Sequence, residues 1–231
     1  MRLIGVLGCV SSPSTILPSH LLNQQVKARL GGNHSARVAL HNIDCNAIRA
    51  DHPGDWATIA KLLLAELQVL LSFRPDCWII ANNTLHTVYD HIAHLLPPSP
   101  PMFHAVQLLC AHLLATGRQR ILLLGTRFTM VDGSCATSLR AAGIGVDIPA
   151  AADRQRMEQI QRQLAAGEAD PAAFADYFTS LIARHAAQGC DAVITACTEL
   201  PLVVTQAISP VPVVNPLELQ CSACVDFALA P

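Results

Sequence analysis

Cys197 is the residue of this sequence best placed to do chemistry. Residues 191–196 before it are mostly apolar and β-branched, a pattern that predicts a buried strand. Thr198 and Glu199, ahead of Pro201, predict a turn from that strand into a helix. A thiol at a helix N-terminus meets exposed backbone N–H groups and the positive end of the helix dipole, which favour the thiolate and form an anion site. Cys197 is therefore a candidate nucleophile or proton carrier, and the alternative interpretation is a buried, inert thiol.

A second stretch of the chain is related to the one around Cys197. Residues 76–86 align without gaps with residues 191–201, at an offset of 115 positions. The alignment pairs Asp76 with Asp191, Ala81 with Ala196, Asn82 with Cys197 and Leu85 with Leu200. Residues 2–8 resemble residues 120–125 at an offset of 117, which supports the same duplication. Two half-length repeats are therefore predicted, and if they pack face to face, Asn82 and Cys197 point at one another.

The composition limits the classes of function. The chain has 231 residues, of which 52% are hydrophobic, so it can bury one large core or two modest ones. Only 14% of the residues are charged, and Lys27 and Lys61 are the only lysines, which argues against a basic surface for nucleic acid. No apolar run approaches the roughly 18 residues that a membrane span requires. Residues 1–8 suit a first strand better than a signal peptide, so we expect a cytoplasmic protein.

The nine cysteines are odd in number and irregularly spaced, which predicts reduced thiols and no disulfide framework. Cys221 and Cys224 form a C-x-x-C pair, but they lie in a predicted helix over residues 217–229, where two buried thiols on one face are the simplest interpretation. His91 and His94 share a helix face without a third ligand, so no metal site is expected there.

Apolar runs and polar turns alternate along the chain in the pattern of an α/β protein. Strands are predicted at residues 3–7, 37–43, 78–81, 121–125, 145–148 and 191–196. Helices are predicted at residues 17–30, 56–72 with Asp55 as N-cap, 87–95, 105–116, one ending at 142, a helix-loop-helix over 153–187, and 217–229. Such alternation implies right-handed crossovers and a parallel sheet in each repeat.

The proline-rich connection at residues 97–101 is the predicted boundary between the repeats. We expect two pseudo-symmetric domains, each a parallel sheet flanked by helices, with the active site in the cleft between them. The first domain is expected to comprise residues 1–101 and 208–231, and the second residues 102–207. Ligands bind beyond the carboxyl ends of parallel strands, where the predicted turns carry hydroxyl and amide groups that could also be helix caps.

Motifs strung along nearly the whole chain resemble those of the aspartate/glutamate racemase family. They lie at residues 8–15, 29–36, 54–56, 83–86, 125–130 and 197–201. The resemblance implies two pseudo-symmetric domains of parallel sheet, a homodimer, no cofactor, and two facing cysteines that exchange one α-proton of an amino acid.

The sequence departs from this family pattern at residues that matter for proton transfer. Asn82 stands where the family has its first cysteine, and an amide can hydrogen-bond a substrate but cannot act as a base near neutrality. Asn215 and Gln220 stand where the family often has an acid and a histidine. Cys197 can therefore serve one face of a planar carbanion, which leaves Thr84 or a water for the other face.

The expected function is a cofactor-independent amino-acid racemase for an aspartate- or glutamate-like substrate, with Cys197 as proton donor and acceptor. Two alternatives stay open: a single-cysteine decarboxylase, isomerase or lyase of a small carboxylate, and a non-catalytic carboxylate-binding paralogue. The catalytic candidates are Cys197, Asn82 and Thr84, and the substrate-binding candidates are Ser14, Thr15, Arg49, Asn83, Thr126, Thr198 and Glu199. The expected partners are a small carboxylate or amino acid and a second copy of the chain, without nucleic acid, membrane, metal or cofactor.

Overall fold

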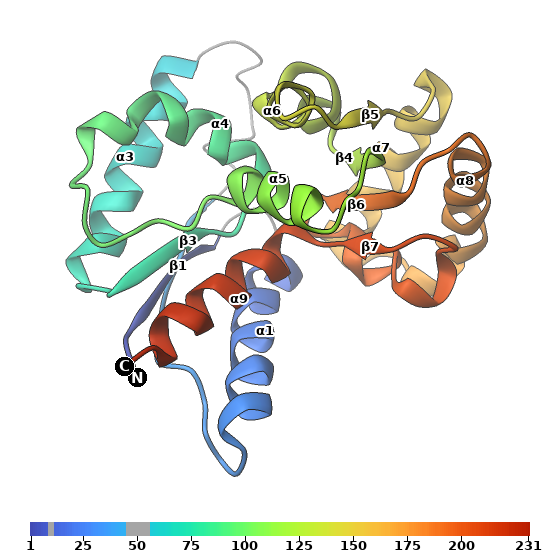
Figure 1. Ribbon diagram of the computed structural model, residues 1–231. Helices are drawn as coiled ribbons and strands as arrows, with labels where there is room; N and C mark the ends of the chain where they lie inside the picture. The colour runs from blue at the N-terminus through green and yellow to red at the C-terminus, as the bar shows by residue number, and fades with distance from the viewer. Residues whose placement is uncertain (9–11, 45–55) are drawn as a thin grey trace. The chain divides into compact units, whose positions relative to one another are not determined.

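Strands and helices alternate along the chain as the sequence predicts, and they form two units (Figure 1). The computed structural model describes residues 1–8, 12–44 and 56–231. Unit 1 consists of Met1–Ala105 and Leu217–Pro231, and unit 2 consists of Val106–Pro216. Each unit contains one parallel β-sheet flanked by helices, which confirms the predicted α/β fold class.

The sheet of unit 1 has three strands in the order β2-β1-β3. The strands are β1 (Ile4–Gly8), β2 (Val38–Asn42) and β3 (Cys77–Ile80). The helices are α1 (Ser12–Leu30), α3 (Trp56–Ser72), α4 (Asn83–Ile92), the 3-10 helix η1 (Ala93–Leu95) and α9 (Pro216–Leu229).

Helices cover both faces of the unit 1 sheet. Ile4 and Val6 of β1 pack in one core with α1 and α9, whereas Leu7 packs in a second core with α3 and α4. β3 alternates in the same way, since Ile79 belongs to the first core and Ile80 to the second. This alternation follows from the period of two residues in a strand, and it makes unit 1 a three-layer α/β/α structure in which α1 and α9 lie side by side (Figure 1).

The sheet of unit 2 has four strands in the order β5-β4-β6-β7. The strands are β4 (Arg120–Gly125), β5 (Gly145–Asp147), β6 (Ala192–Ala196) and β7 (Val213–Val214). The α-helices are α5 (Ala105–Ala115), α6 (Ser134–Ala141), α7 (Ala151–Ala166) and α8 (Ala175–Ala187). Shorter turns are the π-helix η2 (Phe128–Asp132) and the 3-10 helices η3 (Pro171–Phe174), η4 (Leu200–Leu202) and η5 (Gln206–Ile208). β6 is buried along its whole length, as expected for a central strand of a parallel sheet.

The two sheets share one strand register, which supports the sequence duplication. In unit 1, Ile4 of β1 pairs with Cys77 of β3. In unit 2, Ile121 of β4 pairs with Ala192 of β6. Ile4 and Ile121 are related by the offset of 117, and Cys77 and Ala192 by the offset of 115. The central strand pair of each unit is therefore built from equivalent residues.

Equivalent aspartates hold the starts of these strand pairs. Asp76, just before β3, accepts a hydrogen bond from the Leu3 N–H at 2.6 Å. Asp191, just before β6, accepts hydrogen bonds from the Gln119 N–H at 2.7 Å and the Arg120 N–H at 3.4 Å. In both units the carboxylate thus satisfies backbone donors where the neighbouring strand begins, which explains why aspartate occurs in both repeats.

Two helices begin earlier than the sequence indicates. α1 begins at Ser12 and continues through Pro18, whereas the sequence predicts a start near residue 17. α4 begins at Asn83 because Asn82 caps it, whereas the sequence predicts a start near residue 87. The predicted N-cap Asp55 lies outside the described residues.

The short strand β7 is not indicated by the sequence. Val213 and Val214 pair with Val193 and Ile194 of β6, which joins this segment to the sheet of unit 2. The structure accordingly divides the chain after Ala105 and after Pro216, whereas the expected division falls after residues 101 and 207.

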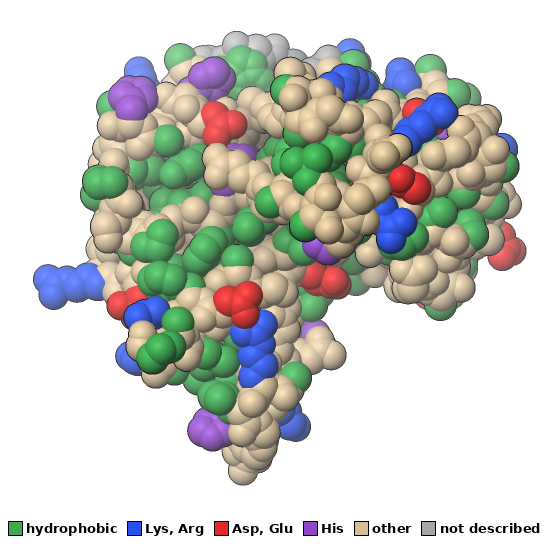
Figure 2. All heavy atoms as spheres, viewed as in Figure 1, with side chains coloured by type: hydrophobic (Ala, Val, Ile, Leu, Met, Phe, Trp, Pro, Cys, Tyr) green, Lys and Arg blue, Asp and Glu red, His purple; other side chains and the backbone are tan. Residues whose placement is uncertain are grey.

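Charged residues make up only 14% of the chain. On the face drawn in Figure 2, the Lys and Arg side chains are scattered among uncharged and hydrophobic groups. Among the described residues, none of the helices combines the length and the apolar character needed to cross a lipid bilayer.

Candidate active site

The carboxyl ends of β1 and β2 carry a threonine–asparagine pair. Thr15 Oγ1 donates a hydrogen bond to Asn42 Oδ1 at 2.8 Å, and Asn42 lies opposite Gly8 in the strand register. A Cβ on Gly8 would lie 2.7 Å from Thr15 Cγ2, so the absence of a side chain at Gly8 is what permits this approach. Asn42 is a polar residue of this edge that the sequence does not single out. The pair places an amide and a hydroxyl where ligands of parallel sheets bind.

Asn82 follows β3 and caps α4. Its Oδ1 accepts a hydrogen bond from the Leu85 N–H at 3.0 Å, and its backbone is extended, with φ −154° and ψ 116°. Asn83 and Thr84 are half-buried in the first turn of α4, beside the backbone N–H groups that a helix leaves unbonded. The side-chain oxygen of Asn82 therefore caps α4, while its NH₂ group can donate a hydrogen bond to a ligand. This strand end can hold a carboxylate, but at Asn82 it offers no group that takes up a proton.

A buried pair of histidines lies beneath the start of α4. His86 is fully buried, and its Nε2 lies 3.2 Å from the Ile80 carbonyl and 3.3 Å from Gln220 Nε2. Its ring packs against that of His104, with 4.3 Å between centroids and 58° between the ring planes. Burial and the nearby His104 hold the pKa of His86 well below its usual range, so the ring is neutral. These contacts favour a packing role for His86 and give Gln220 a partner in the core.

In unit 2 a pair of hydroxyl groups follows the carboxyl end of β4. Thr126 Oγ1 lies 2.9 Å from Thr129 Oγ1 and accepts a hydrogen bond from the Thr129 N–H at 3.2 Å. A Cβ on Gly125 would lie 3.2 Å from both the Ala196 carbonyl oxygen and Thr129 Cβ, so this position is also crowded. Gln161 of α7 is buried and donates from Nε2 to the Gly125 carbonyl at 3.0 Å. Gln161 is a second supporting residue that the sequence does not indicate.

Cys197 follows β6 and is paired with a carboxylate. Its Sγ donates a hydrogen bond to Glu199 Oε2 at 2.9 Å, and Thr198 Oγ1 donates to the same oxygen at 3.2 Å. The three side chains are buried, with 8% of Cys197 and 2% of Glu199 exposed. Because Gly125 pairs with Ala196 in the register, Cys197 and Thr126 follow neighbouring strand ends. The arrangement supplies a thiol, an acceptor for its proton and a hydroxyl that fixes the acceptor.

The helix expected after Cys197 is not formed. Only the three-residue 3-10 helix Leu200–Leu202 follows, with Glu199 before it. A helix dipole needs aligned peptide groups over more than one turn, so the prediction of a helix N-terminus beside the thiol is wrong. The structure instead gives Cys197 a hydrogen bond to the Glu199 carboxylate.

The other cysteines of the described residues are free thiols, as the sequence predicts. Burial raises the pKa of Cys135 to about 12 and raises the pKa of Cys221 beyond its usual range. A hydrogen bond with Cys77, followed by burial, raises the pKa of Cys224. Cys221 and Cys224 are therefore packed, protonated thiols of α9, which favours the simplest interpretation of their C-x-x-C spacing.

The structure brings the predicted site residues together in two groups. In unit 1, Thr15 lies in the first turn of α1 against Gly8 of β1, and Asn82, Asn83 and Thr84 lie where β3 leads into α4. In unit 2 they follow β4 and β6, and they are Thr126, Cys197, Thr198 and Glu199. Arg49 and the side chain of Ser14 lie outside the described residues. That Asn82 opposes Cys197 across a cleft stays a prediction.

These features define an α/β protein with two parallel-sheet units and a buried thiol–carboxylate pair at a strand end. The family model of the Asp/Glu/hydantoin racemases matches residues 7–224 of this chain. The chain therefore belongs to the Asp/Glu/hydantoin racemase family, which confirms the resemblance in its motifs.

Solved structures agree with this assignment. A candidate Asp/Glu racemase from Yersinia pestis is 32% identical, with a TM-score of 0.85 and full coverage of both chains. An aspartate racemase homologue from Pyrococcus horikoshii is 23% identical, with a TM-score of 0.82 and full coverage of both chains. Glutamate racemase from Francisella tularensis, solved with D-glutamate, is 16% identical with a TM-score of 0.68, over 98% of this chain and 80% of that one. The last two likenesses concern the fold alone.

Proposed function

We propose that this protein is a cofactor-independent isomerase that exchanges the α-proton of an aspartate- or glutamate-like amino acid through Cys197. The observation that carries the proposal is the 2.9 Å hydrogen bond from Cys197 Sγ to Glu199 Oε2 at the end of β6, between two buried side chains. Family membership supports the type of chemistry. The name of the similar Yersinia pestis protein, a candidate Asp/Glu racemase that is 32% identical over the whole of both chains, supports an amino acid with a second carboxylate.

Two protons move in the proposed step, the thiol proton of Cys197 and the α-proton of the substrate. Glu199 accepts the thiol proton of Cys197, and the resulting thiolate removes the α-proton of the substrate, since the thiolate is the reactive form. Thr198, which donates to the same Glu199 oxygen, holds the carboxylate in place for the transfer. The electron pair left on the α-carbon delocalises into the substrate carboxylate, and return of the proton from Cys197 reverses the step.

The developing negative charge requires hydrogen-bond donors around the substrate carboxylate. We assign this role to the first turn of α4, where Asn83, Thr84 and the backbone N–H groups lie, together with the Asn82 NH₂ group. The hydroxyls at the ends of the other strands would hold the rest of the substrate, and Arg49 is proposed for a second carboxylate. The residues with this role are Ser14, Thr15, Thr126 and Thr198. A homodimer, a cytoplasmic location and independence from pyridoxal phosphate stay predictions.

Asn82 decides between two versions of this chemistry. Racemisation needs a proton carrier on each face of the carbanion. The Oδ1 of Asn82 is used to cap α4, and its remaining NH₂ group can donate a hydrogen bond but cannot take up a proton. Full racemisation therefore requires Thr84 or a water on that face. The second candidate function, favoured by the same observation, is one-base chemistry of Cys197 on a small carboxylate, such as decarboxylation, isomerisation or elimination.

The test follows the α-proton of L- and D-aspartate and L- and D-glutamate in deuterated water by NMR, with optical purity followed by chiral chromatography. We expect the wild-type protein to exchange the α-proton and Cys197→Ala to lose exchange by about 10²–10⁴-fold, the usual contribution of a positioned acid–base group. Glu199→Gln should lower the rate in the same direction, because the thiol then loses its proton acceptor. Cys110→Ser is the matched control, since Cys110 is a free, partly buried thiol of α5 that is not among the residues assigned to the site.

Each outcome separates the candidates. Exchange with loss of optical purity supports a racemase in which Thr84 or a water replaces the missing cysteine. Exchange without inversion supports a one-base site built on Cys197. No exchange of any of the four amino acids would contradict the proposed substrate class and favour another small carboxylate, and exchange that survives Cys197→Ala would overturn the role of Cys197.

A further inference from the structure

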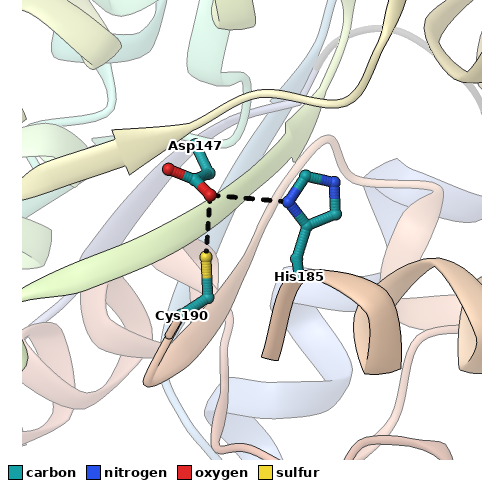
Figure 3. Close-up of side chains that lie close together, drawn as sticks. All are labelled: Asp147, His185 and Cys190. Atoms are coloured by element: carbon teal, nitrogen blue, oxygen red, sulfur yellow. Dashed lines mark hydrogen bonds and ion pairs between the residues drawn. The ribbon is translucent and has the colours of Figure 1, made fainter. Parts of the chain in front are cut away.

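Three potential metal ligands converge at the opposite end of β6 from Cys197 (Figure 3). Asp147 is the last residue of β5, His185 lies in the last turn of α8, and Cys190 lies in the loop that leads into β6. Cys190 Sγ lies 3.3 Å from Asp147 Oδ2, and His185 Nδ1 lies 3.6 Å from the same oxygen. All three ligand atoms lie within 4.8 Å of one another. The sequence gives no sign of this cluster because His185 lies 38 positions after Asp147.

The spacing of these atoms fits the dimensions of a tetrahedral zinc site. Zinc bonds of about 2.0 Å to nitrogen or oxygen and about 2.3 Å to sulfur place neighbouring ligand atoms about 3.4–3.6 Å apart. The distances from Asp147 Oδ2 to Cys190 Sγ, 3.3 Å, and to His185 Nδ1, 3.6 Å, are close to these values. Imidazole, thiolate and carboxylate are also the three side-chain ligands that zinc uses most in proteins.

The backbone around the cluster is held independently of any ion. The Cys190 N–H donates to the His185 carbonyl at 3.1 Å, which closes the five-residue step from one ligand to the next. Arg120 Nη1 donates to the Gln188 carbonyl at 2.8 Å within the same loop. A site whose ligands are preset in this way loses little chain entropy when an ion binds.

Arg120 also forms two hydrogen bonds with the Asp147 carboxylate. Its Nε donates to Asp147 Oδ1 at 3.0 Å and its Nη2 donates to Oδ2 at 2.9 Å. The carboxylates that bind metals are commonly oriented by such a hydrogen bond from a second residue. An ion at Oδ2 would compete with the Nη2 contact but not with the Nε contact, which lies on the other oxygen.

One ring nitrogen in the cluster lacks a hydrogen-bond donor or acceptor. Within the described residues, His185 Nδ1 is buried and makes no hydrogen bond, and its neighbour at 3.6 Å is Asp147 Oδ2. A buried polar atom without a hydrogen bond is costly, and a metal ion at the centre of the cluster would satisfy it.

We propose that Asp147, His185 and Cys190 bind one zinc ion, with a water as the fourth ligand. On binding, the Cys190 thiol releases its proton to solvent and the thiolate, the neutral imidazole and the carboxylate each donate a lone pair to the ion. Zinc remains in its divalent state, so the step needs no oxidant or reductant.

The expected role of the ion is structural: it would cross-link the segments at the amino-terminal edge of the unit 2 sheet. It would join β5, α8 and the loop before β6, adding to the hydrogen bond between Cys190 and Asp147 and to the backbone bond between Cys190 and His185. Cys190 and Cys197 lie on either side of β6 (Ala192–Ala196), and at about 3.3 Å per strand residue the two thiols lie too far apart to share one ion. Zinc binding should therefore not depend on Cys197.

The test is a titration of the full-length, chelator-treated protein with Co²⁺ and then with Zn²⁺. Co²⁺ bound tetrahedrally through a thiolate gives a sulfur-to-metal charge-transfer absorption and intense visible bands, which Zn²⁺ should abolish by displacement. We expect one equivalent of ion per chain, and a rise in the midpoint of thermal unfolding with added Zn²⁺, because the ion binds the folded state.

Variants of the ligands decide whether the cluster is the site. Cys190→Ser should remove the charge-transfer absorption, and His185→Gln should weaken binding by about tenfold or more. Cys110→Ser and Cys197→Ala should leave both the absorption and the affinity unchanged. Circular dichroism of each variant without metal separates loss of the ligand from loss of the fold. Binding of no ion by the folded wild-type protein, or binding unaffected by Cys190→Ser and His185→Gln, would overturn the proposal.

Discussion

The carboxyl ends of β3 and β6 occupy equivalent places in the two units but carry different groups. Asn82 follows β3 and accepts a hydrogen bond from α4, which continues for ten residues. Cys197 follows β6 and donates a hydrogen bond to Glu199, with only a three-residue 3-10 helix beyond it. One strand end therefore uses its side chain to begin a helix, and the other presents a thiol to a proton acceptor.

This difference shows how a duplicated fold can separate stability from chemistry. The backbone register around the two positions is the same, since Ile80 pairs with Leu7 as Thr195 pairs with Leu124. The two strand ends differ in the side chain that follows the strand and in the helix beyond it. A capping side chain must accept a hydrogen bond, whereas a proton carrier must be able to release a proton.

Exchanging the two residues should give the largest effect. Cys197→Asn should lower α-proton exchange by about 10²–10⁴-fold, because an amide cannot carry the proton. Asn82→Cys should retain exchange and raise the ratio of inversion to exchange, because it supplies a second thiol. NMR in deuterated water and chiral chromatography measure the two rates. An unchanged ratio in Asn82→Cys would indicate that the two strand ends do not face the same carbon.

Substitution of Gly8 and of Gly125 by alanine should destabilise both units, but only the clash at Gly8 should be relieved by shortening a neighbouring side chain. Gly8→Ala brings a Cβ to 2.7 Å from Thr15 Cγ2, and Gly125→Ala brings one to 3.2 Å from the Ala196 carbonyl oxygen. Each should lower the free energy of unfolding by about 1–3 kcal/mol through overpacking, as measured by urea denaturation.

A second substitution separates the two glycines. Thr15→Ser removes Cγ2 and should recover much of the loss in Gly8→Ala. Thr129→Ser should not rescue Gly125→Ala, because the backbone contact remains. Equal rescue at both positions would contradict this account.

Removing the cap on α4 should have a moderate effect that is confined to unit 1. Asn82→Ala should lower the free energy of unfolding by about 1 kcal/mol, because the Leu85 N–H loses its acceptor. Asn82→Ser is the matched control, since a hydroxyl can also cap a helix, and it should cost only a few tenths of that amount. A similar loss in both variants would show that the hydrogen bond contributes little to stability.

The paired aspartates should give the smallest effect. Asp191→Ala removes an acceptor of two backbone N–H groups, and Asp76→Ala removes an acceptor of one. We expect both to lower the free energy of unfolding by no more than about 1 kcal/mol, with the larger loss in Asp191→Ala. Denaturation of the two variants in parallel measures the difference, and a larger loss in Asp76→Ala would contradict the hydrogen-bond count.

The sequence predicts the alternation of strands and helices because parallel sheets require apolar strands and amphipathic helices. Strands such as Ile4–Gly8 and Ala192–Ala196 are found within a residue or two of their predicted ends. The start of α4 and the strand β7 are harder to predict from the sequence. The capping role of Asn82 can be recognised only once the helix is placed, and the two valines of β7 are too few to show a strand pattern.

The candidate site likewise has features that the sequence predicts and features that only the tertiary structure shows. The sequence by itself determined the family and the duplication and singled out Cys197 as the candidate proton carrier, because these rest on residue types and spacings along the chain. The tertiary structure alone decided that Glu199, and no helix dipole, is the partner of Cys197. It alone gathered Asp147, His185 and Cys190 into one cluster and placed Asn42 against Thr15. The physical reason is that hydrogen bonds and metal geometry depend on distances in space, which residues far apart in the sequence acquire only when the chain folds.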